Sequence, residues 1–355
     1  MIESLLLVNF SKLAKSQPIG NNVTAIQVSS LSKSFFVPVR DAGLKAALES
    51  LVNRKTREVQ AVKNITFAIE PGEIVGFLGP NGAGKTTTLK MLAGLLYPTS
   101  GTAAVLGYTP SQRDKSYLRQ MTLIAGNRNQ LIWDIPALDS FELNRAIYRL
   151  PEDEFRHTRD EFIELLDMQE IVSKPVRNLS LGERMKVEIA AALLHKPKAL
   201  FLDEPTIGLD VTMQRRIRAF VREYNRRYEA TVLLTSHYMA DVEALCKRVI
   251  VIHHGRILFD GALSELVDRF KAQKRLVVTV ERGMVDLSRF GEVVSQVDGR
   301  ITLQVSKKDA PAITARLLNE IPVADLLVED PSIEDVIEDV FAQKIENEPD
   351  TAVAA

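Results

Sequence analysis

The sequence has little cysteine, no long apolar run and almost no net charge. Its one cysteine, Cys246, excludes an intramolecular disulfide and favours a reducing compartment. No stretch approaches the roughly 18 consecutive apolar residues that a membrane-spanning helix needs. The chain carries 45 Lys and Arg against 46 Asp and Glu, a balance that argues against a broad nucleic-acid-binding face. We therefore expect a cytoplasmic protein that binds no nucleic acid and does not itself cross a membrane.

The two ends of the chain carry little pattern. The apolar run Leu5 to Val8 is short and no basic segment precedes it, so we expect no signal peptide. Residues 1–24 are interpreted as an N-terminal extension, and residues 345–355 as a disordered tail. At 355 residues the chain has the length of about two domains.

A glycine-rich stretch carries the strongest motif. It reads Gly79-Pro80-Asn81-Gly82-Ala83-Gly84-Lys85-Thr86-Thr87 and fits G-x-x-x-x-G-K-[ST], the phosphate-binding loop. The apolar run 73–78 before it predicts a buried strand, and residues 87–96 predict a helix, which is the context that this motif requires. The glycines let backbone N–H groups point at phosphate oxygens. Lys85 can then reach the β- and γ-phosphates of a nucleotide, and the Thr86 hydroxyl can bind Mg²⁺.

Two carboxylates follow an apolar strand downstream of this loop. The run 200–202 leads directly into Asp203 and Glu204. An acid at the carboxyl end of a buried strand in such a fold is placed to hold Mg²⁺, which is the role predicted for Asp203. Glu204 could polarise the attacking water as a general base. The alternative is a strand that simply runs into a polar turn.

Short strands alternate with helices around these motifs. Expected strands lie at 25–28, 65–69, 103–106, 199–202, 231–234, 248–252 and 257–259, in a domain that spans 25–267. The alternation predicts an α/β fold with a mostly parallel sheet covered on both faces. Within it, residues of about 111–178 predict a helical subdomain, with an apolar stripe assigned to its core. Residues 38–58 are interpreted as an insertion with a basic amphipathic helix on the surface, or alternatively one that contacts a membrane or partner.

The pattern changes after a linker expected at 268–274. Strands are predicted at 276–280, 293–297, 301–305 and 326–328, with helices at 310–319 and 332–341. These elements predict a small α+β accessory domain over 268–344 with no catalytic constellation. Dimerisation or regulation is the role we expect for it.

Taken together, the motifs resemble those of the ATP-binding subunit of an ABC transporter. Leu179-Ser180-Leu181-Gly182-Glu183 resembles the family's signature, Gly208-Leu209-Asp210 its D-loop, and Thr235-Ser236-His237 its switch histidine. The resemblance covers roughly residues 25–265 and implies a P-loop NTPase fold of the ABC-ATPase type. Residues 65–342 most resemble the ABC-2-type exporter class, whose ATPase ends in an acidic segment like Pro331-Ser332-Ile333-Glu334-Asp335.

The resemblance implies that two ATPase subunits stack head to tail and enclose two ATP molecules with Mg²⁺. Ser180 and Gly182 would cap the γ-phosphate held by the partner, with Asp210 bridging the two subunits. His237 would contact the γ-phosphate and orient the water. Ser180 and Glu183 also fit a helix capping box, which needs no ligand. The partners implied are a second ATPase subunit, in a homodimer, and a separately encoded transmembrane permease at the cytoplasmic face of a membrane.

Three positions in this comparison stay open. Phe35 fits the aromatic residue that stacks on adenine, although it could be a core residue and Phe36 competes with it. The metal-ligating glutamine of the family falls near Asn127, with Gln130 as an offset alternative. Trp133 could anchor the permease or lie in the core.

Two departures from the family pattern bear on turnover. Glu183 replaces the usual glutamine and should weaken anion binding unless its carboxylate caps backbone N–H groups. Asn127 is one methylene shorter than glutamine and would reach Mg²⁺ less well. Alternatives to a transport ATPase are therefore a slow, nucleotide-gated binding module and a non-transport ATPase of the same fold.

Overall fold

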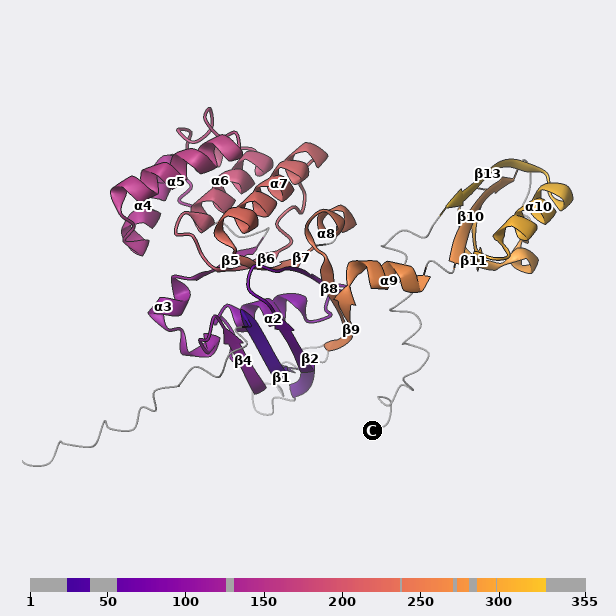
Figure 1. Ribbon diagram of the computed structural model, residues 1–355, viewed down its shortest axis with the longest axis horizontal. Helices are drawn as coiled ribbons and strands as arrows, with labels where there is room; N and C mark the ends of the chain where they lie inside the picture. Colours follow the sequence, from indigo (N-terminus) through magenta and orange to yellow (C-terminus); the bar gives the residue numbers. More distant parts are fainter. Residues whose placement is uncertain are drawn as a thin grey trace, which may run out of the picture.

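The computed structural model describes residues 24–38, 56–125, 131–236, 238–270, 273–280, 286–297 and 299–329. A six-stranded sheet forms the centre of the larger part (Figure 1). In spatial order its strands are β5 (Met121–Ala125), β6 (Ala199–Asp203), β7 (Thr231–Thr235), β3 (Ile74–Leu78), β8 (Arg248–His253) and β9 (Arg256–Ala262). All neighbouring strands are parallel except β9, which pairs antiparallel with β8. The predicted mostly parallel sheet is confirmed.

Both faces of this sheet are buried because its strands are apolar at nearly every position. In β6, Leu200 and Leu202 point into one core while Ala199 and Phe201 point into the other. Successive side chains of a strand lie on opposite faces, so a strand covered on both sides is apolar throughout.

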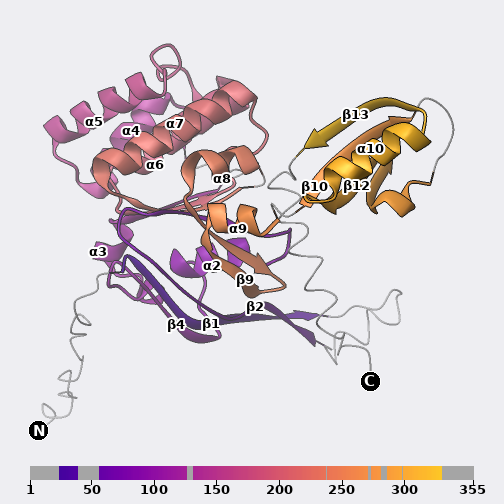
Figure 2. The same ribbon diagram turned by 45° about the vertical axis from the view of Figure 1, so that its right-hand side comes forward.

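Helices cover one face of the sheet and a second sheet covers the other. The helical side contains α4 (Ala137–Tyr148), α5 (Glu152–Leu165), α6 (Leu181–Leu193), α7 (Val211–Tyr228) and α8 (Met239–Leu245). On the other side, α2 (Lys85–Leu92) lies between the six-stranded sheet and an antiparallel sheet of β2 (Thr56–Ile69), β1 (Ile26–Pro38) and β4 (Ser100–Val105) (Figures 1 and 2). Short elements complete this part, namely η1 (Pro110–Gln112), α3 (Lys115–Leu118), η2 (Val176–Asn178) and α9 (Leu263–Phe270).

Two sequence-based boundaries in this part need correction. The region 111–178 is not helical throughout, because β5 lies within it and pairs in parallel with β6. Such a short, mostly apolar run cannot be assigned to strand or helix from periodicity alone. The proposed insertion 38–58 is also shorter than expected at both ends: Pro38 ends β1 and pairs with Thr56, the first residue of β2. Residues 39–55, which include the expected basic helix, lie outside the described residues.

The C-terminal part has its own core. The sheet order is β11 (Glu292–Val297), β12 (Arg300–Ser306), β10 (Gln273–Val280) and β13 (Val323–Glu329), accompanied by η3 (Ser288–Phe290) and α10 (Ala310–Glu320). The predicted strands and the helix at 310–319 are confirmed, whereas the expected linker at 268–274 is wrong because α9 extends to Phe270 and β10 begins at Gln273. The acidic helix expected at 332–341 lies outside the described residues. Among the described helices, none is long and apolar enough to span a membrane.

The apolar stripe expected in the helical subdomain is part of the core. Phe162 of α5 is 1% exposed and meets Phe220 of α7 edge to face, with ring centroids 5.2 Å apart. Phe155 and Leu166 are equally buried. This cluster joins α5 to α7, the helix that follows the D-loop.

We expect Phe162→Ala to lower the free energy of unfolding of the larger, N-terminal part by about 3–5 kcal/mol, because it leaves a cavity beside Phe220. Ile147→Ala is a matched control: Ile147 lies on α4 but is 60% exposed, so a change within ±0.5 kcal/mol is expected. Urea titration of each variant measures both values. Equal losses in the two variants would contradict the assignment of Phe162 to the core.

Candidate functional site

The candidate site forms where three neighbouring parallel strands end. The phosphate loop follows β3, Asp203 ends β6, and Thr235 ends β7. Since the sheet order is β6-β7-β3 and the strands are parallel, their carboxyl ends meet at one edge. Ligands of open α/β sheets bind at such edges.

The phosphate loop has the backbone geometry that its glycines predict. Gly84 has a φ of +108° and immediately precedes α2, and an ideal Cβ there would lie 2.5 Å from the carbonyl oxygen of Ala61. Gly79 is equally crowded, since its Cβ would lie 2.1 Å from the carbonyl oxygen of Ile252. Neither position accepts a side chain without movement of the backbone.

The β8–β9 turn connects this loop to the second sheet through backbone hydrogen bonds. Gly255 N donates to Ala83 O at 3.0 Å, and Lys63 N donates to Gly255 O at 2.8 Å. The turn of the phosphate loop is thereby fixed from β2 and from β8, and its N–H groups are held in place before any ligand binds.

Lys85 lies inside the loop with little exposure to solvent. The residue is 5% exposed, and its Nζ donates to Gly79 O at 2.5 Å and to Pro80 O at 3.1 Å. Burial lowers the pKa of this ammonium, and the negative charges of Glu204 and Asp203 oppose that shift. A cation held here among carbonyl groups is suited to anionic phosphate oxygens.

Asp203 joins the loop to the neighbouring strand. Its Oδ2 accepts a hydrogen bond from Thr86 Oγ1 at 2.8 Å, and its Oδ1 accepts one from Thr235 Oγ1 at 2.7 Å. The oxygens of Thr86 and Asp203 form a hard donor pair of the kind that Mg²⁺ prefers, with phosphate and water completing its shell. No cluster of three His, Cys, Asp or Glu side chains occurs in the described parts of the chain, so any metal held here depends on such additional ligands.

Glu204 has an unusual backbone conformation directly after β6. Its φ is +55°, a region that non-glycine residues rarely occupy. Its N–H donates to both the carbonyl oxygen and the Oγ1 of Thr235, at 3.0 and 3.1 Å. Backbone strain of this kind concentrates at functional sites.

Comparison with known proteins gives the family. A protein-family model described as "ABC transporter" matches residues 62–207, and one described as "EvrA-like ABC transporter, C-terminal domain" matches residues 272–329. The ABC transporter ATP-binding protein NatA of Bacillus subtilis is 35% identical over 219 residues, which are 62% of this chain and 89% of NatA. This chain belongs to the ABC transporter ATP-binding protein family.

Further relatives agree with this assignment. The linearmycin resistance ATP-binding protein LnrL of B. subtilis is 30% identical over 77% of this chain and 91% of its own length. The bacitracin transport ATP-binding protein BcrA of Bacillus licheniformis is 34% identical over 59% of this chain and 67% of its length. Among solved structures, cbiO1 of Clostridium perfringens, described as part of the transporter complex cbiONQ, aligns with a TM-score of 0.56 and 25% identity over 70% of this chain and 95% of cbiO1.

Family membership confirms the predicted P-loop NTPase fold of the ABC type and the predicted activity. The chain is an ATP-binding subunit that hydrolyses ATP to drive transport. ATP-binding subunits of this family pair with transmembrane permeases and dimerise.

The ABC signature segment begins a helix. Ser180 is the N-cap of α6, and Glu183 N donates to Ser180 Oγ at 3.3 Å while Ser180 N donates to Glu183 Oε2 at 2.9 Å. These hydrogen bonds lower the pKa of the Glu183 carboxyl. Glu183 therefore has the capping orientation that the sequence left open, and its carboxylate is occupied by the backbone of its own helix.

The signature and the D-loop of the same chain pack on each other. A Cβ on Gly208 would lie 3.3 Å from Leu181 Cδ2, and one on Gly182 would lie 3.0 Å from Met213 Cγ. Asp210 caps α7, accepting a hydrogen bond from Met213 N at 3.0 Å. Ser180 and Asp210 are exposed, and no hydrogen bond or ion pair joins residues 179–183 to the phosphate loop, both of which the structure describes.

The aromatic candidates differ in exposure. Phe36 is 71% exposed, whereas Phe35 is half-buried, with Lys33 Nζ 5.2 Å from its ring centroid. Neither belongs to a described core cluster, so the interpretation of Phe35 as a core residue is wrong. Trp133 is 45% exposed with the Arg184 guanidinium 5.4 Å from its ring, so its core interpretation is wrong too.

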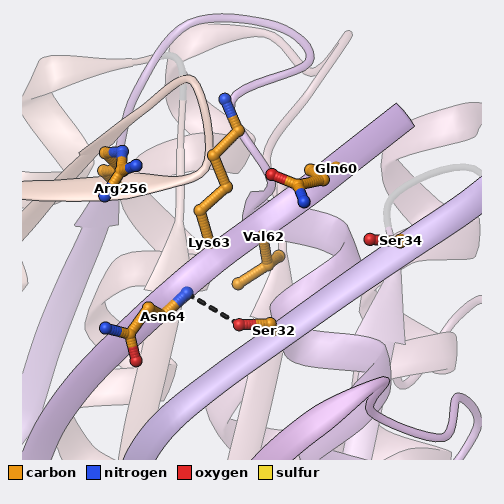
Figure 3. Close-up of a pocket in the computed structure, with 7 residues that line it drawn as sticks. All are labelled: Ser32, Ser34, Gln60, Val62, Lys63, Asn64 and Arg256. Atoms are coloured by element: carbon orange, nitrogen blue, oxygen red, sulfur yellow. Dashed lines mark hydrogen bonds between the residues drawn. The ribbon is translucent and has the colours of Figure 1, made fainter. Parts of the chain in front are cut away.

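No local sequence pattern predicts the pocket that β1, β2 and β9 form (Figure 3). Its volume is 220 Å³, and it is lined by Ser32, Ser34, Gln60, Val62, Lys63, Asn64 and Arg256. It adjoins the phosphate loop through Val62, whose Cγ2 lies 3.3 Å from the Cβ position of Gly84. The bulged register of β1 and β2 brings six of these side chains together, and β9 supplies Arg256. Three predicted site residues, Asn127, Gln130 and His237, lie outside the described residues.

We expect Gly84→Ala to weaken ATP binding, because the added methyl must displace the Ala61 carbonyl. A strained backbone costs about 1–3 kcal/mol, which corresponds to a roughly five- to 150-fold loss in affinity. Gly107→Ala is the matched control: Gly107 also has a positive φ, +79°, but nothing lies within 4 Å of its Cβ position. Titration with a fluorescent ATP analogue measures both variants, and equal affinities would contradict the crowding argument.

Proposed function

We propose that this chain powers export through a separately encoded permease by closing and opening a head-to-tail homodimer. The observation that carries the proposal is the set of hydrogen bonds that joins Thr86, Asp203 and Thr235 next to Glu204. The residues expected to act on nucleotide, metal and water thus lie at one edge of the sheet. The similarity to BcrA, a bacitracin transport protein, and to LnrL, a linearmycin resistance protein, supports export as the direction.

In this proposal the N–H groups of residues 79–87 bind the phosphates of ATP, and Lys85 leaves the Gly79 and Pro80 carbonyls to contact the β- and γ-phosphates. Thr86 and Asp203 hold Mg²⁺, with Asn127 or Gln130 as an additional ligand. The bound ion supplies neutralisation of phosphate charge. Phe35, which pairs with Val59 between β1 and β2, stacks on adenine in this proposal.

Hydrolysis then depends on Glu204 and His237. Glu204 takes a proton from the attacking water, while His237 orients the γ-phosphate and that water. Ser180 and Gly182 of the second copy cap the γ-phosphate with the amino end of α6, whose dipole favours an anion. Glu183 does not oppose this arrangement, because its carboxylate turns back onto Ser180 N. The exposure of Ser180 and Asp210 in the single chain supports their use by a partner copy.

We propose that movement of the ATPase subunit is transmitted to the permease through residues 131–134. Ile132 and Trp133 are 46% and 45% exposed, and Leu143 and Ile147 of α4 are also exposed. Arg177 N donates to Trp133 O at 3.0 Å, and Arg184, directly after the signature, lies over the Trp133 ring. Movement of the signature helix therefore reaches this apolar surface through direct contacts. At this surface we place the permease, on the cytoplasmic face of the membrane.

We expect Glu204→Gln to reduce ATP turnover by at least about a hundredfold and to accumulate as an ATP-bound dimer, because the general base is lost while ATP binding remains. Glu164→Gln, at an exposed position of α5, removes the same charge elsewhere and should behave as wild type. Phosphate release and light scattering in Mg²⁺-ATP measure turnover and dimerisation. Wild-type turnover in Glu204→Gln would overturn the proposed role of Glu204, and no turnover by wild type, alone or with its permease, would leave only nucleotide-gated binding.

A further inference from the structure

A buried carboxylate behind the candidate site has no place in the mechanism above. Asp241, in the first turn of α8, is 1% exposed. Its Oδ2 accepts hydrogen bonds from Thr206 Oγ1 at 2.5 Å and from Ser236 Oγ at 2.6 Å. A carboxylate costs several kcal/mol to bury unless it is paired and hydrogen-bonded. These contacts therefore constrain the segments that supply them.

The counter-charge comes from a third segment. Arg218 Nη1 of α7 lies 3.3 Å from Asp241 Oδ1, and the Arg218 side chain is only 10% exposed. This oxygen receives no well-aligned hydrogen bond from the described residues, so the attraction to Arg218 is mainly coulombic. In a buried setting such an attraction is little screened, and separation of the two charges leaves Asp241 uncompensated.

Each partner of Asp241 is adjacent to a residue of the proposed mechanism. Thr206 lies two positions after Glu204, in a turn that Ile207 N closes by donating to Glu204 O at 3.2 Å. Ser236 directly precedes His237 in the sequence, and its Oγ accepts a hydrogen bond from Tyr238 N at 3.0 Å. Arg218 lies on the helix whose N-cap is Asp210.

We propose that Asp241 is a positioning residue for ATP hydrolysis, which holds the Glu204 turn, the His237 loop and helix α7 in one fixed arrangement. The proposal rests on the roles proposed above for Glu204 and His237. Three segments bound to one buried carboxylate cannot move independently, because a shift of any one of them leaves a buried charge or hydroxyl unpaired. Asp241 is buried and contacts Thr206, Ser236 and Arg218, so it acts through these three residues.

Thr206→Val tests the link to the Glu204 turn, because valine keeps the shape of threonine and removes only the hydroxyl. We expect kcat for ATP hydrolysis to fall about tenfold to a hundredfold, the effect of a small misplacement of reacting groups. The dissociation constant for ATP should stay within roughly twofold of wild type, since the phosphate loop is untouched. Asp241→Asn should likewise lower kcat, by a larger factor, and leave the dissociation constant for ATP nearly unchanged.

The double variant Thr206→Val/Asp241→Asn separates positioning from general damage. If the two residues act through one contact, the double variant loses less activity than the product of the single losses. Asp260→Asn is the matched control: Asp260 pairs with Arg248 at 2.7 Å on the β8–β9 hairpin, away from both loops. It should lower the melting temperature without a change in kcat. A wild-type kcat in Thr206→Val and Asp241→Asn would overturn the proposal, as would multiplicative losses.

The outcomes also separate this inference from the proposed function. If Glu204→Gln abolishes turnover while the Asp241 and Thr206 variants retain it, only the positioning role fails. If Glu204→Gln retains wild-type turnover, the assignment of Glu204 fails and the inference fails with it. Should Asp241→Asn not fold, Thr206→Val and Ser236→Ala decide the question, because each keeps the buried Asp241–Arg218 pair.

Discussion

The hydrogen bond from Thr235 to Asp203 is the interaction on which the arrangement of the site depends. One threonine side chain, fully buried at the end of β7, fixes Asp203 on one side and receives the Glu204 N–H on the other. Asp203 in turn accepts from Thr86 of the phosphate loop. The three strand ends are therefore joined by side-chain hydrogen bonds that supplement the backbone pairing. The two contacts of Thr235 are partly buried, so water competes with them poorly, whereas the Thr86–Asp203 hydrogen bond is exposed.

The same strand edge leads to the surfaces that are proposed to meet a second chain. Beyond Glu204 the chain passes Thr206 and reaches the D-loop, which packs against the signature of the same subunit through Gly208 and Leu181. The signature helix contacts Trp133 through Arg184. Nucleotide site, dimer surface and exposed apolar surface thus form one continuous series of contacts. This continuity is the physical basis for the proposed coupling of ATP turnover to movement of a permease.

Much of the fold could be predicted from the sequence, because apolar runs of strand length and the phosphate-loop motif are local signals. The assignments of β3, β6 and β7 rest on such runs, and so does the order of the motifs along the chain. Strand β5 could not be predicted, because four apolar residues and one threonine do not distinguish a strand from a helix. The capping orientation of Glu183 could be anticipated, since a capping box depends only on residues three positions apart.

The parts of the site that could not be predicted depend on tertiary register. Nothing local in the sequence places Ser34 opposite Gln60, or brings Asp241 to Thr206 across 35 positions. Thr235 did carry a signal, because a threonine directly follows the apolar run Val232 to Leu234, but its bond to Asp203 depends on the neighbouring strand order. The positive φ of Glu204 likewise cannot be predicted from the residue identities.

The central claim is that ATP joins the phosphate loop of one subunit to the signature of another, and site-directed disulfide cross-linking tests it most directly. Asn81→Cys and Leu181→Cys place thiols at exposed positions of the two motifs, in a Glu204→Gln, Cys246→Ala background. We expect a mixture of the two variants to cross-link rapidly with ATP and slowly without it, and Asn81→Cys mixed with Glu164→Cys not to cross-link. Equal cross-linking with and without ATP, or none with ATP, would contradict the account.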